Sequence, residues 1–153
     1  MNERTRWVLQ TQLPPEEVTR ALVDFGPERG RIWAETSHPQ VYAVHRVGTD
    51  WAEVTEGVPF SWSRERYNWS VPGRVVLEQL ASNVAVPGGR IEYTITPTAS
   101  GSLIECDRRR RFRRTPRGIV AATLMRSVGP ALLRRQFDAA LRRLSATSPD
   151  QSA

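Results

Sequence analysis

A dense run of positive charge lies near the end of the β-rich middle of the chain: residues 107–117 read DRRRRFRRTPR. Arginine carries a planar fork of N–H donors that grips carboxylates and phosphates and can stabilise an enolate. Alternate residues of a strand share one face, so Arg108 and Arg110 lie on the same side as Ile104 and Cys106. If that side lines a cavity, one or two arginines would bind the carboxylate, phosphate or enolate of a ligand.

Two other interpretations of this arginine run remain open from the sequence. In one, it is a solvated strand end whose arginines pair with acids on neighbouring strands, namely Glu65, Glu78, Glu92 or Glu105. In the other, it is a surface patch for an acidic partner such as nucleic acid, an anionic membrane or an acidic carrier protein. Phe112 is the one aromatic residue within the run and no nucleic-acid motif is present, so no nucleic-acid partner is expected.

Other reactive residue types are sparse. His38, His45 and Cys106 are the only imidazoles and thiol, and they fall on separate predicted elements without the spacing of metal ligands. A cysteine nucleophile needs a positioned base beside it, and none can be assigned to Cys106. Gly88-Gly89 indicates a turn rather than a phosphate-binding loop. We therefore assign no catalytic residue and expect neither a metal nor a cofactor.

Aromatic side chains are numerous for the length of the chain. They either pack in the core or form a pocket wall that stacks on a flat or apolar ligand. Tyr93 shares a strand face with Ile91 and Ile95, so we expect it to point inward. The full set is Trp7, Trp33, Trp51, Trp62, Trp69, Tyr42, Tyr67 and Tyr93.

The predicted strand over residues 61–70 mixes apolar and charged side chains on both faces. Alternation therefore does not decide which face is inside. A strand that is polar on both faces is typical of the border of a partly wet cavity. One face carries Trp62, Arg64 and Arg66, and the other carries Glu65, Tyr67 and Trp69.

Length and composition indicate one domain with a core of its own. The chain has 153 residues, a formal net charge of +6 and one cysteine, so no internal disulfide is possible. All 22 basic residues are arginine, which a GC-rich genome explains at least in part. No leader and no long apolar run is seen, and we expect a cytoplasmic protein without membrane insertion. We expect residues 1–147 to form the domain and residues 148–153 a disordered tail.

The elements that must position these residues follow from periodicity and turn residues. Alternation predicts strands, and Pro, Gly and Asp mark the turns between them. Pro14-Pro15 followed by Glu16 and Glu17 predicts a helix start. The predicted strands cover residues 5–12, 41–47, 51–56, 61–70, 74–80, 90–96 and 102–113; short helices lie near 15–25 and 27–34, and a long helix covers 116–145.

The long helix carries two apolar runs on either side of Gly129-Pro130, where Pro130 should bend it. Spacings of three and four predict one continuous buried stripe. Its first part is Val120, Leu124 and Val128, and its second part is Leu133, Phe137, Leu141 and Leu144.

The order of elements resembles the helix-grip fold of the START-like (SRPBCC) superfamily, which includes polyketide cyclases, plant pathogenesis-related proteins and lipid-transfer domains. The segments 14–24, 89–93, 101–104 and 132–144, together with Trp33, carry the resemblance, which covers residues 5–146. It implies an α+β fold in which a curved seven-stranded antiparallel sheet and two short helices are closed by a long C-terminal helix.

The resemblance also implies a cavity between sheet and helix that binds a hydrophobic small molecule, a lipid or a polyketide-like compound. A non-catalytic binder or carrier is therefore the leading hypothesis. The alternative is an aromatase/cyclase-type enzyme acting on a substrate bound to an acidic carrier protein, with Arg66, Arg108, Tyr93 and His45 as its working groups. The residues expected to bind the ligand are Trp33, Tyr42, Arg66, Tyr93, Arg108, Val120, Leu124 and Val128.

Overall fold

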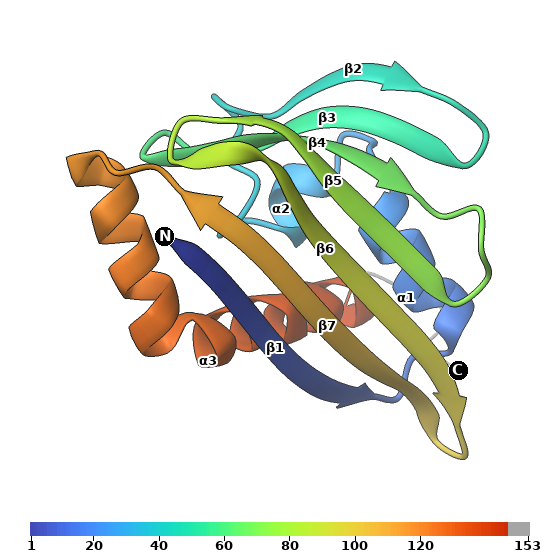
Figure 1. Ribbon diagram of the computed structural model, residues 1–153. Coiled ribbons are helices and arrows are strands. Elements are labelled where there is room, and N and C mark those ends of the chain that lie inside the picture. Colours follow the sequence, from blue (N-terminus) through green and yellow to red (C-terminus); the bar gives the residue numbers. More distant parts are fainter. Residues whose placement is uncertain (147–153) are drawn as a thin grey trace.

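The computed structural model describes residues 1–146, and residues 147–153, which include the predicted tail, lie outside that range. Seven strands and three helices follow the expected order (Figure 1). The elements are β1 (Asn2–Thr11), α1 (Pro15–Val23), α2 (Arg29–Ile32), β2 (Ala43–Val47), β3 (Trp51–Val58), β4 (Ser61–Asn68), β5 (Arg74–Ser82), β6 (Ala85–Thr98), β7 (Gly101–Phe112) and α3 (Pro116–Ala146).

The strands form one antiparallel sheet in the order β1-β7-β6-β5-β4-β3-β2. From β2 to β7, neighbouring strands in the sheet are also consecutive in the chain, so short hairpins connect them. The pair β1 and β7 is the exception, because the first strand of the chain pairs with the last. The sheet curves around α1 and α2, and α3 runs across the same side, mainly against β1 (Figure 1). This is the fold class that the sequence predicts.

Helix α1 forms where the sequence places its start signals. Pro15 occupies the first turn, where a missing N–H costs no hydrogen bond, and Glu16 and Glu17 lie near the positive end of the helix dipole. The helix buries Val18 and Leu22 against the sheet.

Helix α3 consists of two arms that meet at an angle, as Figure 1 shows. Pro130 lies inside the helix and cannot donate a backbone hydrogen bond, which accounts for a bend there. The second arm buries Phe137 and Leu141, so this part of the predicted stripe is confirmed.

The first arm of α3 buries a different face from the one predicted. Val120, Leu124 and Val128 are 55%, 46% and 47% exposed. Small residues cover the sheet instead, and they let the helix approach closely: Gly118, Ala121, Ala122 and Gly129. The prediction that this apolar stripe faces the core is wrong, because the bend gives the two arms different buried faces and periodicity follows large apolar residues rather than small ones.

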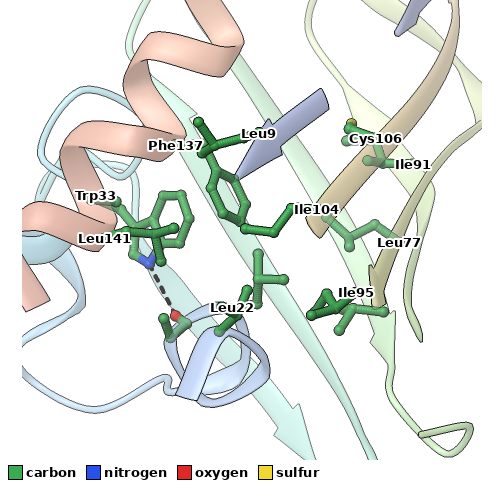
Figure 2. Packing of buried hydrophobic residues seen from close by; sticks show 14 of the residues in the cluster. Leu9, Leu22, Trp33, Leu77, Ile91, Ile95, Ile104, Cys106, Phe137 and Leu141 are labelled. Atoms are coloured by element: carbon green, nitrogen blue, oxygen red, sulfur yellow. Dashed lines mark hydrogen bonds between the residues drawn. The ribbon is translucent and has the colours of Figure 1, made fainter. Parts of the chain in front are cut away.

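The main core lies between the concave side of the sheet, α1 and the second arm of α3 (Figure 2). Val18, Val54, Val75 and Ile104 have no exposed surface. Trp33 lies against Phe137, and its indole Nε1 donates a hydrogen bond to the carbonyl oxygen of Ala21 at 3.1 Å, drawn as a dashed line in Figure 2. This contact ties the end of α2 to both α1 and α3.

Strand β6 is longer than the sequence predicts, because it begins before the segment Pro87-Gly88-Gly89. This segment forms a bulge rather than a terminal turn: the register with β7 shifts between Val86 and Arg90. A Cβ on Gly89 would lie 2.8 Å from Oε1 of Gln79, so the bulge brings the backbone close to a side chain of β5.

Candidate functional site: a cavity with a charged wall

A cavity of about 300 Å³, partly open to solvent, lies between the concave face of the sheet and α3. Its size is at the lower end of the range for small-molecule sites. The apolar part of its wall comes from Trp7, Leu22, Trp33, Leu77, Ile91, Tyr93, Cys106, Met125, Leu132, Leu133 and Phe137. The polar part comes from Arg29, Glu35, Thr36, Glu56, Ser61, Ser63, Glu65, Tyr67, Arg108, Arg110 and Gln136, and Gly57 and Val58 complete the lining.

Strand β7 delivers two arginines to this cavity. Its alternating residues Ile104, Cys106 and Phe112 are buried, so Arg108 and Arg110 point the same way, while Arg109 and Arg111 are exposed on the other face. Three interpretations of the arginine run were open from the sequence. Arg108 and Arg110 lie in the cavity wall, as the interpretation with inward-facing arginines predicts.

Arg110 and Glu65 form a buried ion pair in the cavity wall. The Arg110 side chain donates from Nη2 to Oε1 of Glu65, and each side chain is 6% exposed. Nη1 of Arg110 also lies 3.5 Å from the hydroxyl of Ser63, which accepts a hydrogen bond from Nε2 of Gln79 at 3.0 Å. Four side chains from β4, β5 and β7 therefore form one connected polar network.

Three atoms of this network have no hydrogen-bond partner among the described residues: Oε2 of Glu65, Oε1 of Gln79 and Nε of Arg110. An unpartnered buried polar atom costs free energy, and a carboxylate oxygen costs more than a neutral one. Glu65 lines the cavity and is 4% exposed as a residue. A water molecule or a donor group of a ligand in the cavity would satisfy Oε2.

Arg108 lies in the same wall without an acidic partner: within residues 1–146, no carboxylate forms an ion pair with it. Its Nη1 lies 3.1 Å from the sulfur of Met125 on α3, a weak acceptor. Burial, followed by repulsion from Arg110, lowers the pKa of Arg108 to about 10, while Glu65 acts in the opposite sense. Arg108 and Arg110 together exceed Glu65 by one positive charge.

Arg29 is buried like Arg110, whereas Arg108 is half-buried, and the fork of Arg29 is fully used by the fold. Its Nε and Nη2 donate to the two carboxylate oxygens of Glu56 at 3.0 and 2.9 Å, and Nη1 donates to the carbonyl oxygens of Leu22 and Asp24. Tyr67 donates to Glu56 at 2.6 Å. Burial alone would lower the pKa of Arg29, but Glu56 and Tyr67 raise the pKa above its ordinary value. Arg29 fastens α2 to the sheet.

The apolar wall contains two groups that could exchange protons, and both are held neutral. Burial raises the pKa of the Cys106 thiol to about 12, and burial also raises the pKa of the Tyr93 hydroxyl. The Tyr93 ring lies 5.5 Å from the Phe137 ring and 6.1 Å from that of Trp7. Neutral thiol and phenol groups act as weak donors toward a ligand rather than as bases.

Three of the predicted ligand-binding residues lie together in the cavity wall: Trp33, Tyr93 and Arg108. Two others lie elsewhere. Tyr42 is half-buried outside the cavity and donates to the carbonyl oxygen of Phe25 at 2.9 Å. Arg66 points to the opposite face of the sheet, where it lies over the Trp51 ring and 3.4 Å from Glu53.

The remaining predicted ligand-binding residues, Val120, Leu124 and Val128, point into solvent for the reason given above. His45, the suggested proton carrier, lies on the exposed strand β2 and contacts the hydroxyl of Thr55 at 2.7 Å. Neither histidine lines the cavity.

Glu56 and Arg29 are two of the polar cavity residues that sequence reasoning missed. Glu56 had a signal, because it alternates with the buried residues Ala52 and Val54 on β3. Arg29 had none, since a four-residue helix has too few residues for a periodicity.

No protein-family model matches the sequence, and no curated protein matches it. Solved structures do match the fold. The Zhui aromatase/cyclase from Streptomyces sp. R1128 aligns with a TM-score of 0.76 at 10% identity, over 100% of both chains. Norcoclaurine synthase from Thalictrum flavum, in complex with dopamine and hydroxybenzaldehyde, aligns with a TM-score of 0.68 at 9% identity, over 98% of this chain and 90% of that one.

A START superfamily protein from Mycobacterium smegmatis aligns with a TM-score of 0.63 at 12% identity, over 96% of this chain and 98% of that one. At such low identities these matches establish the fold alone. The chain has the START-like helix-grip fold that its sequence predicts. No helix within residues 1–146 has the length and apolar character needed to span a membrane.

Proposed function

We propose that this START-like chain binds a small molecule with an apolar body and an anionic oxygen group, and that the bound molecule lies in the cavity beneath α3. The position of Arg108 carries the proposal. An arginine in a cavity wall without an acidic partner raises the free energy of the empty protein, and an anionic ligand group offsets that cost.

The apolar wall supports the other half of the proposed ligand. Trp7, Trp33, Tyr93 and Phe137 line the cavity, and the first three contact the Phe137 ring. Aromatic walls bind flat or apolar groups, and a few placed polar groups orient them. The unpartnered Oε2 of Glu65 calls for a hydroxyl or N–H donor near the anionic group.

Binding without catalysis is the reading that the cavity groups favour. Acid–base catalysis near neutral pH works best with a group whose pKa lies near that pH. Burial moves the pKa values of Cys106 and Tyr93 further from neutrality. The histidines lie outside the cavity, and the carboxylates in its wall, Glu35, Glu56 and Glu65, are each engaged by an arginine of the fold.

A matched pair of fluorescent probes tests the proposal. 1-Anilinonaphthalene-8-sulfonate carries an apolar body and an anion, and N-phenyl-1-naphthylamine is its neutral counterpart. The wild type should bind the sulfonate more tightly than the neutral probe. Arg108→Met should weaken sulfonate binding by tenfold or more and leave neutral-probe binding within about twofold, as expected for loss of a charge-assisted hydrogen bond.

Equal affinity of the wild type and Arg108→Met for the sulfonate would refute the proposal. Binding outside the cavity is tested with Leu124→Ser/Val128→Ser, a variant of two residues that are exposed on α3. This variant should bind both probes as the wild type does.

The second candidate function is that of a cyclase-type enzyme. The alignment with an aromatase/cyclase over the whole of both chains favours it, as does an arginine placed where it could stabilise an enolate. Here Arg108 would polarise a carbonyl of a bound chain, and Tyr93 would donate a hydrogen bond. Turnover of a carrier-bound polyketone that falls at least a hundredfold in Arg108→Met would support this function, and unchanged turnover would exclude it.

A further inference from the structure

The first arm of α3 presents an uncovered apolar surface at one end of the molecule. Four side chains of this arm are between 46% and 55% exposed, and Phe60 in the turn between β3 and β4 is 45% exposed. We call this surface the apolar face; it consists of Ile119, Val120, Leu124, Val128 and Phe60.

Positive charge in excess of acid lies beside the apolar face: Arg126 on this arm pairs with Glu3, and Arg108 and Arg110 lie in the cavity wall, but other nearby arginines have no acidic partner among the described residues. Residues 108–137 contain ten arginines and no aspartate or glutamate. Arg111, Arg113 and Arg114 are exposed just before α3, and none of them forms an ion pair with a carboxylate of the described chain. The Arg117 guanidinium lies 5.5 Å from the centre of the Phe60 ring, so this arginine belongs to the same surface.

The two features together fit an anionic lipid surface. A helix with an apolar face and nearby arginines lies in the plane of a membrane interface, where its apolar side chains enter the acyl boundary and its arginines reach the headgroups. A second copy of this chain is disfavoured because pairing two such faces would bring the two arginine sets together. We propose that the first arm of α3 and the β3–β4 turn dock this protein reversibly onto anionic membranes.

The docked orientation would bring the cavity to the membrane. Met125 lies on the docking arm and lines the cavity, and Ser61, the neighbour of Phe60, also lines it. Ligand exchange between bilayer and cavity would then occur over a short path. The docking proposal does not depend on whether the cavity binds or transforms its ligand.

A single-cysteine label tests the contact directly. Cys106 is buried, so a polarity-sensitive fluorophore attached to Leu124→Cys under native conditions reports on the apolar face alone. With vesicles of equal parts phosphatidylglycerol and phosphatidylcholine, its emission should shift to the blue. The same label at Val44→Cys on β2, where the native side chain is 41% exposed, should not shift.

Vesicle co-sedimentation measures the contribution of each feature. Arg113→Gln/Arg114→Gln should weaken binding to the anionic vesicles about 25-fold, at about fivefold for each arginine near an anionic surface. Arg20→Gln/Arg31→Gln removes the same charge from exposed positions on the α1–α2 side and should change binding by less than twofold. Leu124→Ser/Val128→Ser should weaken binding at least tenfold while leaving cavity binding of N-phenyl-1-naphthylamine unchanged.

Four results would overturn the docking proposal. The first is no shift of the Leu124→Cys label with anionic vesicles. The second is an equal loss of binding in the two charge variants, which would show attraction by net charge alone. The third is a dimer in solution that Leu124→Ser/Val128→Ser dissociates, which would identify a second copy as the occupant. Selective binding of an acidic protein without any vesicle binding would likewise contradict it.

Discussion

Arg110 on β7 and Glu65 on β4 form an ion pair across the cavity wall, although 45 residues separate them in the chain and each side chain is only 6% exposed. Removing one partner of a buried pair leaves the other charge uncompensated. Arg110→Met and Glu65→Leu should each lower the free energy of unfolding by about 3–5 kcal/mol, as measured by urea denaturation.

The double variant Arg110→Met/Glu65→Leu serves as the control for this pair. Because it removes both charges, it should recover most of the stability that each single variant loses. Additive losses in the double variant would show that the pair does not act as a unit.

Arg108 should separate stability from binding. Its guanidinium is desolvated and lies near Arg110, as its lowered pKa of about 10 reflects. Arg108→Met should therefore leave the free energy of unfolding unchanged or raise it, even as it loses affinity for anionic probes. A clear drop in stability, measured in the same denaturation assay, would indicate that Arg108 is a structural residue like Arg29.

Two glycines of helix α3, Gly118 and Gly129, differ in how much room a side chain would have, so replacing each with alanine gives a matched comparison. A Cβ on Gly118 would lie 2.1 Å from the carbonyl oxygen of Arg113, whereas a Cβ on Gly129 would lie 3.3 Å from the sulfur of the flexible Met125 side chain and 3.8 Å from the Thr5 hydroxyl. Alanine gains about 1 kcal/mol over glycine from helix propensity. Gly118→Ala should nevertheless lower the free energy of unfolding, measured by thermal denaturation, by about 1–3 kcal/mol. Gly129→Ala should be neutral or stabilising, and the reverse order would contradict this account.

Cys106 should be nearly inert toward thiol reagents in the folded protein. It is buried, and burial raises the pKa of its thiol to about 12, so little thiolate is present at neutral pH. Labelling with a disulfide reagent should proceed at the rate of unfolding and become fast in denaturant. Rapid labelling of the native protein would contradict this prediction. It would show that the reagent reaches Cys106 through the cavity and that the thiol is ionised there.

Glu35 and Arg143 connect the loop after α2 to α3 and give a dependence of stability on pH. A hydrogen bond from Arg143 lowers the pKa of Glu35 below its ordinary value of 4.5. Such a carboxylate stabilises the fold fully above its unfolded-state pKa, and that contribution is lost as pH falls through the lower folded-state pKa. The stability difference between the wild type and Glu35→Gln should be constant from pH 6 to 8 and disappear in acid. A difference that persists in acid would assign the effect to packing.

The sequence predicts the fold because its strong signals are local. Alternation at Ile91, Tyr93 and Ile95 and the Pro15-Glu16-Glu17 helix start each specify an element without knowledge of distant contacts. The bulge at Pro87–Gly89 was predicted as a turn, because proline and glycine mark both.

The site residues were predictable only on strands where one face is clearly more apolar than the other. Arg108 shares its face with residues that are plainly apolar, and the structure places it in the cavity wall. On β4 both faces are mixed, so the sequence left the inward face open; the structure places Glu65 in the cavity wall and the predicted ligand-binding residue Arg66 on the opposite face. On α3 the small residues Gly118, Ala121 and Ala122 define the buried face, and a hydrophobicity pattern gives them little weight.

The most direct test of the central claim is a crystal structure of the protein purified from its native host, examined for density in the cavity. We expect a bound molecule whose apolar part lies against Trp33, Tyr93 and Phe137 and whose anionic oxygen lies about 2.7–3.2 Å from the Arg108 guanidinium. A cavity that holds only water, or a ligand bound elsewhere with Arg108 uncontacted, would contradict the account.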